Sequence, residues 1–118
     1  MNAREELLFT QPTAKQIAFF ANNSTRSGTM ADAHWHGAWE ILFIRRGWGN
    51  QRINTSTFDF HMGDVIVIRS GDIHATDALS PQGCDIDVLH FTKAIFPSPV
   101  SDELPASGII HSGTIESE

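Results

Sequence analysis

The stretch GTMADAHWHGAWEILFIRRG, residues 28–47, places two histidines and a glutamate at spacings that suit one metal ion. Its candidate ligands are His34, His36 and Glu40. Side chains alternate faces along an extended strand, so these three point the same way if one strand runs through them. Two imidazoles and a carboxylate form the facial set that binds Zn, Ni, Mn or Fe and leaves coordination positions open. The stretch therefore predicts one wall of a metal site.

Composition limits what the rest of the chain can be. A length of 118 residues with 41% hydrophobic and 19% charged residues is typical of one folded domain. Fourteen acidic against eight basic residues leave a net charge of -6, which argues against direct contact with nucleic acid. No apolar run is long enough for a signal peptide core or a membrane span, and the lone Cys84 excludes an internal disulfide. We expect a cytoplasmic protein.

Short β-friendly runs separated by Gly, Pro, Asn and Ser indicate an all-β sandwich or barrel, because no convincing amphipathic helix interrupts them. Gly47–Asn50 has the residues of a hairpin reversal, with a return strand after it. The sheet is expected to end at Phe91. The strands are predicted at residues 17–20, 30–44, 51–54, 58–60, 65–68, from about 73, and 85–91.

The predicted organisation is a single domain over residues 1–118. An N-terminal arm is expected at 1–12 and the barrel at 17–92. The C-terminal segment, residues 93–118, contains Pro97, Pro99 and Pro105, which forbid a long helix or a central strand between them. Residues 93–106 are therefore expected to be loop with at most one helical turn. No DNA-binding domain is present in these residues.

A second histidine block supplies the opposite wall of the predicted site. The run GDVIVIRSGDIH, residues 63–74, reads as a strand, a tight glycine turn and a histidine that opens the next strand. His74 is thus the predicted fourth ligand. Facing strands of a small barrel can bring it opposite His34, His36 and Glu40, with a ligand-sized mouth between them.

These residues resemble the two motifs of the cupins, small double-stranded β-helix barrels of jelly-roll type. The first motif, G-x5-H-x-H-x3-E-x6-G, matches at Gly28, His34, His36, Glu40 and Gly47. The second, G-x5-P-x-G-x2-H-x3-N, matches at Gly63, Gly71 and His74, with Arg69 in place of proline and Ala78 in place of asparagine. The two departures bear on turn rigidity and barrel closure more than on metal chemistry.

A narrower resemblance joins three blocks, HWHGAWEILFIRRGWG, GDVIVIRSGDIH and the strand of residues 85–92 followed by KAIF. Their order is similar to the N-terminal sensor domain of arabinose-type (AraC-family) transcription regulators. The resemblance implies a domain that binds a small-molecule effector and forms a homodimer. It also implies that DNA is contacted only through a C-terminal helix-turn-helix domain not in this chain.

Three residues are weaker candidates for effector contact. His90 is expected on a strand that lines the barrel, Arg52 offers a bidentate anchor for a carboxylate, and Trp48 sits at a turn that could form a pocket rim. A lone histidine or arginine is more often structural or solvated. Trp35 and Trp39 fall on the face opposite the ligands, so packing or a dimer surface is expected for them.

Two other functions remain open. A stand-alone cupin metalloenzyme of dioxygenase or isomerase type needs an acid or base near the metal; the chain has no Tyr, and Glu40 could act as that base if it is not a ligand. No catalytic residue is assigned. A metal-free dimerisation scaffold, in which the His and Glu residues form a hydrogen-bonded pocket floor, is the other. The complete ligand set favours the metal-binding sensor.

Overall fold

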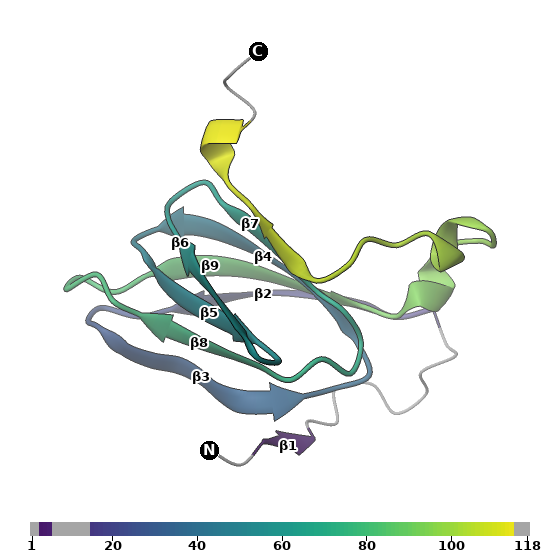
Figure 1. The fold of residues 1–118 in the computed structure, drawn as a ribbon, viewed down its shortest axis with the longest axis horizontal. Helices are drawn as coiled ribbons and strands as arrows, with labels where there is room; N and C mark the ends of the chain where they lie inside the picture. Colours follow the sequence, from purple (N-terminus) through teal and green to yellow (C-terminus); the bar gives the residue numbers. More distant parts are fainter. Residues whose placement is uncertain (1–2, 6–14, 115–118) are drawn as a thin grey trace.

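Two five-stranded sheets face each other and form a small barrel (Figure 1). The computed structural model describes residues 3–5 and 15–114. The first sheet contains, in spatial order, β1 (Arg4–Glu5), β3 (Gly28–Trp35), β8 (His74–Ala78), β5 (Gly49–Ile53) and β6 (Ser56–Phe60). The second contains β10 (Gly108–Ile110), β7 (Val65–Ile68), β4 (Trp39–Arg46), β9 (Asp85–Phe91) and β2 (Ile17–Asn23). The predicted all-β barrel is confirmed.

Helical structure in the described residues is limited to three short 3-10 turns. They are η1 (Lys93–Ile95), η2 (Val100–Asp102) and η3 (Ser112–Thr114). Pro97, Pro99 and Pro105 prevent a longer helix, as the sequence predicted, but residues 93–106 contain two helical turns, η1 and η2, where at most one was expected. None of the described helices has the length and apolarity needed to cross a bilayer.

Strands with strong local signals lie where the sequence predicts them. β7 begins after Gly63-Asp64 and consists entirely of Val and Ile, which suit a pleated, half-buried surface. β9 alternates half-buried and buried residues from Asp85 to His90, so its inner face carries Ile86, Val88 and His90. These alternations fix which side chains face the barrel interior.

The chain does not follow the single strand expected through residues 34–40. β3 ends at Trp35 and β4 begins at Trp39, so His36, Gly37 and Ala38 form a corner between the two sheets. Period-two counting across this corner was therefore wrong. The ligand residues still converge, because the inner faces of the two sheets look toward each other.

Gly47 also marks a passage between sheets and not the predicted hairpin. β4 pairs with β7 and β9, whereas β5 pairs with β6 and β8. Gly47 has a φ of +87°, and a Cβ there would lie 2.3 Å from the carbonyl oxygen of Gly83. Glycine is needed at this crossing both for the backbone angle and for the close approach.

Two further expectations concern the ends of the chain. The sheet does not stop at Phe91, because β10 pairs antiparallel with β7 and extends the second sheet. Within the predicted arm, Arg4 and Glu5 form β1, which pairs in parallel with His34 and Trp35. The remainder of the arm, residues 1–2 and 6–12, lies outside the described residues.

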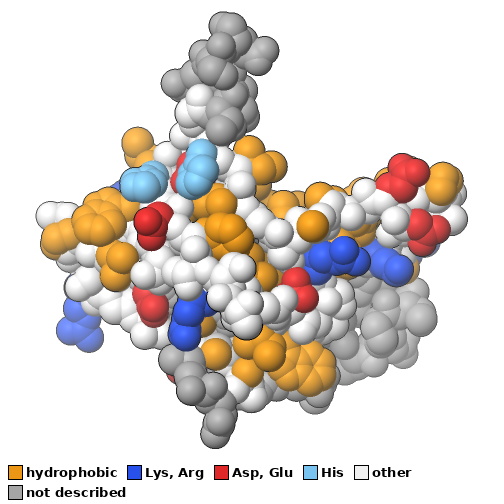
Figure 2. All heavy atoms as spheres, in the orientation of Figure 1, with side chains coloured by type: hydrophobic (Ala, Val, Ile, Leu, Met, Phe, Trp, Pro, Cys, Tyr) orange, Lys and Arg blue, Asp and Glu red, His pale blue; other side chains and the backbone are white. Residues whose placement is uncertain are grey.

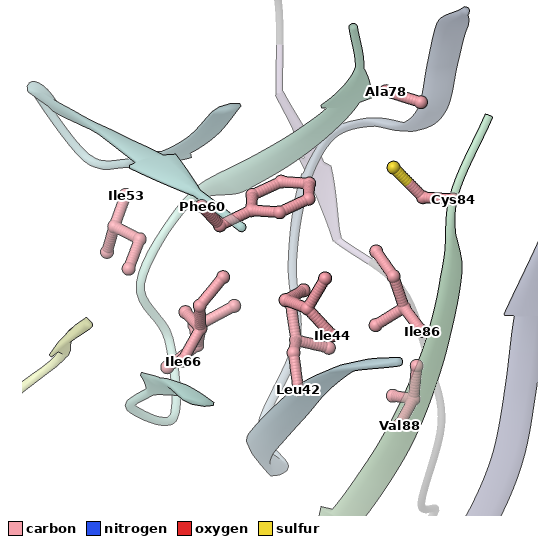
Figure 3. Packing of buried hydrophobic residues seen from close by; sticks show 10 residues of the cluster. Leu42, Ile44, Ile53, Phe60, Ile66, Ala78, Cys84, Ile86 and Val88 are labelled. Carbon is pink, nitrogen blue, oxygen red and sulfur yellow. The ribbon is translucent and has the colours of Figure 1, made fainter. Parts of the chain in front are cut away.

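An apolar core fills the end of the barrel where β4 finishes and β9 begins. Phe60, Ile44 and Ile66 are completely buried there, and Ile86 lies beside them (Figure 3). Cys84 belongs to the same cluster and is fully buried. It therefore acts as a small core residue, in agreement with the lack of any motif around it that would mark a reactive thiol.

Asp64 ties the C-terminal segment to this barrel. It is 2% exposed, and its Oδ1 accepts a hydrogen bond from the backbone N–H of Ser112 at 2.9 Å. Its Oδ2 accepts from the backbone N–H of His61 at 2.8 Å and from Nδ1 of His111 at 2.9 Å. Burial by itself raises the pKa of Asp64, but these hydrogen bonds outweigh it and lower the pKa below its ordinary value of 3.8.

Candidate metal centre

Four side chains from three strands and one corner meet at the other end of the barrel. His34 comes from β3, His36 from the corner, Glu40 from β4 and His74 from β8. His34 and His74 lie directly opposite each other in the antiparallel β3–β8 pair, with ring centroids 4.2 Å apart. One potential ligand atom from each of the four lies within 4.8 Å of all the others. The structure thus brings together all four residues predicted as metal ligands.

Backbone carbonyl groups fix the orientation of the three imidazoles. Nδ1 of His34 donates to the carbonyl oxygen of Asp32 at 2.6 Å, and Nδ1 of His74 donates to that of Asp72 at 2.8 Å. Nδ1 of His36 donates to the carbonyl oxygen of Ala38 at 2.9 Å. A carbonyl oxygen can only accept, so Nδ1 carries a proton. Nε2 can then donate to a carboxylate such as Glu40 when the ring is charged, and it offers a lone pair to a metal when the ring is neutral. Support of this kind selects the tautomer that can bind a metal.

Glu40 is the centre of the cluster and is 6% exposed. Its Oε1 lies 3.1 Å from Nε2 of His36 and 3.6 Å from Nε2 of His74. His90, the residue opposite Glu40 in the β4–β9 pair, places its Nε2 2.5 Å from the same oxygen. Burial by itself raises the pKa of Glu40, but the imidazoles of His36, His74 and His90 outweigh it and hold the pKa well below its usual range. Glu40 is therefore ionised.

The donor set fits a divalent transition metal. Ligand atoms bonded to one such ion at 2.0–2.2 Å lie roughly 3–4 Å from each other. The four ligand atoms lie within 4.8 Å of one another, so a small inward shift of the side chains would bring them to bonding distance. Three lone-pair nitrogens and a carboxylate oxygen repel each other unless a proton or a cation lies between them. Imidazole and carboxylate together suit Zn, Ni, Mn and Fe. The four side chains could therefore bind such a cation in the interior of the barrel.

A cavity of about 170 Å³ opens beside the cluster inside the barrel. His34, Glu40 and His90 form its polar wall. The rest of the lining comes from the inner faces of β2, β3, β4, β8 and β9 and comprises Phe20, Asn22, Ala31, Leu42, Thr76, Ile86 and Val88. The volume is below the range usual for drug-sized ligands, so the cavity suits a small molecule.

The three weaker candidates for effector contact lie in different places. His90 lines the cavity and contacts Glu40. Arg52 lies between Gln51 and Ile53, whose buried side chains face inward, so it projects from the outer side of β5. Trp48 is 45% exposed at the far end of the barrel, where its carbonyl oxygen accepts hydrogen bonds from the N–H groups of Leu79 and Ser80. Neither Arg52 nor Trp48 lines the cavity.

Sequence reasoning missed the apolar and neutral polar lining of the cavity. Phe20 and Asn22 come from β2, which carries no motif. Thr76 donates to the side-chain oxygen of Gln51 at 2.6 Å, and this buried pair belongs to β8 and β5. One signal was present: the pattern Asp-x-His occurs at 32–34 and again at 72–74, and in both cases the carbonyl of the Asp orients the His.

The family whose model matches the chain is described as the AraC-like ligand binding domain, and the match covers residues 16–105. It includes every residue of the four-residue cluster and of the cavity wall. No curated protein matches the chain.

Solved cupin structures share the fold. A variant of Bacillus subtilis oxalate decarboxylase aligns with a TM-score of 0.60 at 20% identity, over 75% of this chain and 24% of that one. A second structure of that enzyme, described by its Mn(II) centres, aligns with a TM-score of 0.60 at 20% identity, over 73% of this chain and 23% of that one. The chain therefore spans about a quarter of the length of these enzymes.

Two smaller cupins align over most of their own length. The cupin domain of Schizosaccharomyces pombe Cnp3 gives a TM-score of 0.61 at 13% identity, over 75% of this chain and 70% of that one. An RmlC-like cupin from Shewanella frigidimarina gives 0.59 at 10% identity, over 64% and 66%. At these identities the likeness shows a cupin fold and nothing about the ligand.

Proposed function

Because the chain belongs to the family of AraC-like ligand-binding domains, we propose that it is the small-molecule-sensing domain of a transcription regulator and holds a divalent metal ion in its barrel. The observation that carries the proposal is the buried cluster of His34, His36, Glu40 and His74, of which His34 and Glu40 line the barrel cavity. A cluster of this kind is costly to bury unless it binds a cation. Its position beside the cavity lets that cation contact a ligand.

The four residues would hold the ion through three Nε2 atoms and one carboxylate oxygen. The bound ion would supply positive charge and open positions for an oxygen or nitrogen atom of the effector. His90 would keep Glu40 oriented by donating from Nε2 to Oε1. The donor set allows Zn, Ni, Mn or Fe, and the Mn(II) of the oxalate decarboxylase structure makes Mn a natural first choice.

The cavity wall limits the effector. Leu42, Ile86 and Val88 present apolar surface, whereas Asn22 and Thr76 offer amide and hydroxyl groups. A volume of about 170 Å³ admits a small metabolite with an apolar side and one or two oxygen donors. His90 is the predicted effector residue that the cavity geometry supports.

The remaining parts of the proposal concern the readout. We expect a cytoplasmic homodimer that contacts DNA through a helix-turn-helix domain outside these residues, since a net charge of -6 disfavours a phosphate backbone. β1 pairs with His34 and Trp35, so the N-terminal arm is attached to the strand that carries a metal ligand. Effector binding can thereby bias the arm or a dimer contact.

The alternative is a small cupin metalloenzyme. The favouring observation is that an ionised Glu40 faces the same cavity as the cluster. Against it, Glu40 is already contacted by three imidazoles, and no other carboxylate lines the cavity in the described residues. A general base must lie within hydrogen-bond distance of the substrate proton, and the contacts of Glu40 with the imidazoles compete with such a role.

A cavity-filling variant separates these functions. Oxalate and acetohydroxamate are metal-binding probes small enough for the cavity, and calorimetry on metal-loaded protein measures their affinity. We expect one-to-one binding that Val88→Phe weakens at least tenfold, about 1.4 kcal/mol, while the metal content stays unchanged. Leu89→Phe, on the outer face of β9, is the matched control and should bind as the wild type does.

Three outcomes would overturn the sensor. Consumption of a probe with release of product supports the enzyme. Absence of binding to metal-loaded protein removes the ligand site. Equal affinities in Val88→Phe and wild type place the probe outside the cavity.

A further inference from the structure

A second hollow, of about 260 Å³, lies outside the barrel cavity and is lined by Gly37, Trp39, Arg69, Ser70 and Lys93. These residues come from the corner between β3 and β4, the first residue of β4, the turn after β7, and the first residue of η1. None of them lines the cavity described above. Any ligand of this hollow therefore binds at a separate place.

Its two charged residues are both basic. No carboxylate of the described residues lies within ion-pair distance of Arg69 or Lys93, although Arg45 and Arg46 each have an Asp partner. Acidic residues outnumber basic ones in the chain, so two cations without an acidic partner in one hollow run against the overall charge. Like charges at close range repel, and an anion between them removes that repulsion. Figure 2 shows basic side chains between the barrel and the η1–η2 segment, with acidic side chains on either side of them.

The wall of the hollow is rigid because Trp39 is fixed from behind. Its ring is 5% exposed and stacks on Phe91, with centroids 6.2 Å apart and an angle of 20° between the planes. The guanidinium carbon of Arg69 lies 5.2 Å from the centroid of the Trp39 ring. A guanidinium held over an aromatic ring still offers planar N–H donors, which match the oxygens of a carboxylate or phosphate.

The backbone around the hollow is also held in place. Ser70 donates its hydroxyl to the carbonyl oxygen of Gly37 at 2.9 Å, and the N–H of Gly71 donates to the carbonyl oxygen of His36 at 2.8 Å. These bonds tie the turn that carries Arg69 to the corner that precedes Trp39. Arg69 itself stands where the second cupin motif usually has proline, so this cation is a departure of this chain from the motif.

We propose that this hollow, formed by Arg69, Lys93 and the edge of Trp39, binds a small oxyanion, namely the phosphate or carboxylate group of a small molecule or free inorganic phosphate. The volume of about 260 Å³ fits a group of that size and is small for a peptide. The site stands independently of the metal, because it shares no residue with the metal cluster.

Tryptophan fluorescence gives a direct test, because the chain contains no Tyr and only three Trp residues. In the Trp35→Phe, Trp48→Phe background the emission reports on Trp39 alone. The protein is stripped of metal with a chelator and titrated with inorganic phosphate, acetate or succinate at constant ionic strength. We expect a saturable change for at least one of these anions. The line width of phosphate in phosphorus NMR provides a reading that does not depend on Trp39.

Variants locate the site. Arg69→Ala and Lys93→Ala should each weaken anion binding about tenfold, and Arg69→Lys should fall between, since it keeps the charge but loses the planar donors. Arg45→Ala removes an exposed cation near the opposite end of β4 from Trp39 and is the matched control. His74→Ala should bind the anion as the wild type does even if it no longer binds metal, so failure of the metal proposal is seen separately.

The proposal is overturned by a linear response to every anion, or by equal affinities in wild type, Arg69→Ala and Lys93→Ala. Tighter binding of an acidic peptide such as oligo-aspartate than of any small anion would also overturn it, because the hollow would then be a protein-docking surface. Among the small anions, a preference for phosphate or for succinate identifies which oxyanion the hollow takes.

Discussion

The two ends of the barrel interior use the same strands for opposite chemistry. On β4 the residue near the start is Glu40 and the residue near the end is Ile44; on β9 the order is reversed, with Ile86 first and His90 last. Antiparallel pairing brings Glu40 beside His90 and Ile44 beside Ile86. One end is therefore closed by hydrophobic packing, and the other carries ionisable groups.

This difference separates stability from function. Burial of apolar side chains stabilises the fold in proportion to the area removed from water, whereas burial of ionisable groups costs free energy unless they are paired. The polar end is nevertheless ordered by backbone carbonyl groups that orient each imidazole. The free-energy cost of burying these ionisable groups would be offset by a cation bound between them.

The largest effect on stability is expected at the apolar end. Phe60→Ala removes a fully buried ring and leaves a cavity, so the free energy of unfolding should fall by about 3–5 kcal/mol. Met62→Ala, two residues later and 65% exposed, should change it by less than about 0.5 kcal/mol. Urea unfolding measures both variants. A similar loss in the two would show that Phe60 is not a core residue.

The next effect concerns the polar end and appears in metal affinity. Glu40→Gln keeps the size of the side chain but removes the charge, so the affinity for Mn²⁺ or Zn²⁺ should fall by more than about 100-fold. Adding Gln51→Glu to the Glu40→Gln variant places a carboxylate elsewhere in the barrel interior. It should not restore the metal affinity, because residue 51 is not part of the ligand set. Calorimetry on chelator-treated protein gives the affinities. Unchanged binding by Glu40→Gln would remove Glu40 from the ligand set.

A smaller effect is expected for His90, which acts through Glu40. His90→Leu removes the donor to Glu40 Oε1 and should weaken metal binding about 10- to 100-fold. His90→Gln retains an N–H donor and should recover part of the loss. A purely structural role predicts that both variants lose thermal stability equally and bind metal with unchanged affinity.

The smallest effect is a change in acid stability far from the metal. The folded-state pKa of Asp64 lies below its unfolded value of 3.8, so Asp64 stabilises the protein fully above that value and loses this contribution as the pH falls through the folded pKa. Asp64→Asn should therefore be less stable by roughly 1 kcal/mol at neutral pH, and the difference should shrink as the pH falls below 3.8. Exposed Asp59→Asn is the control. Unfolding curves that keep the same separation at every pH would contradict this assignment.

Local signals explain why much of this structure was predictable. The Val-Ile-Val-Ile run after Gly63-Asp64 and the alternating run after Gly83 define β7 and β9 without reference to the rest of the chain. The four cluster residues were found because their spacing matched a motif. Their convergence, however, follows from two sheets that face each other and not from one strand.

Errors occurred where the partner of a segment lies far away in the sequence. β10 has three residues after a proline-rich stretch, and it is a strand because Val65–Val67 offers an open edge. Gly47 looked like a hairpin because its local residues suit one, but β4 finds its partners in β7 and β9. The lining from β2 could not be predicted, because no local pattern tells which strand closes a barrel.

The central claim is most directly tested by the metal content of the purified protein and of two ligand variants. Elemental analysis should find about one transition-metal ion per chain in the wild type and a substoichiometric amount in both His34→Ala and His74→Ala, with all three proteins folded by circular dichroism. His111→Ala, an exposed histidine outside the cluster, should retain the metal. A folded wild-type protein that remains metal-free after incubation with Zn²⁺, Ni²⁺, Mn²⁺ and Fe²⁺ would contradict the account.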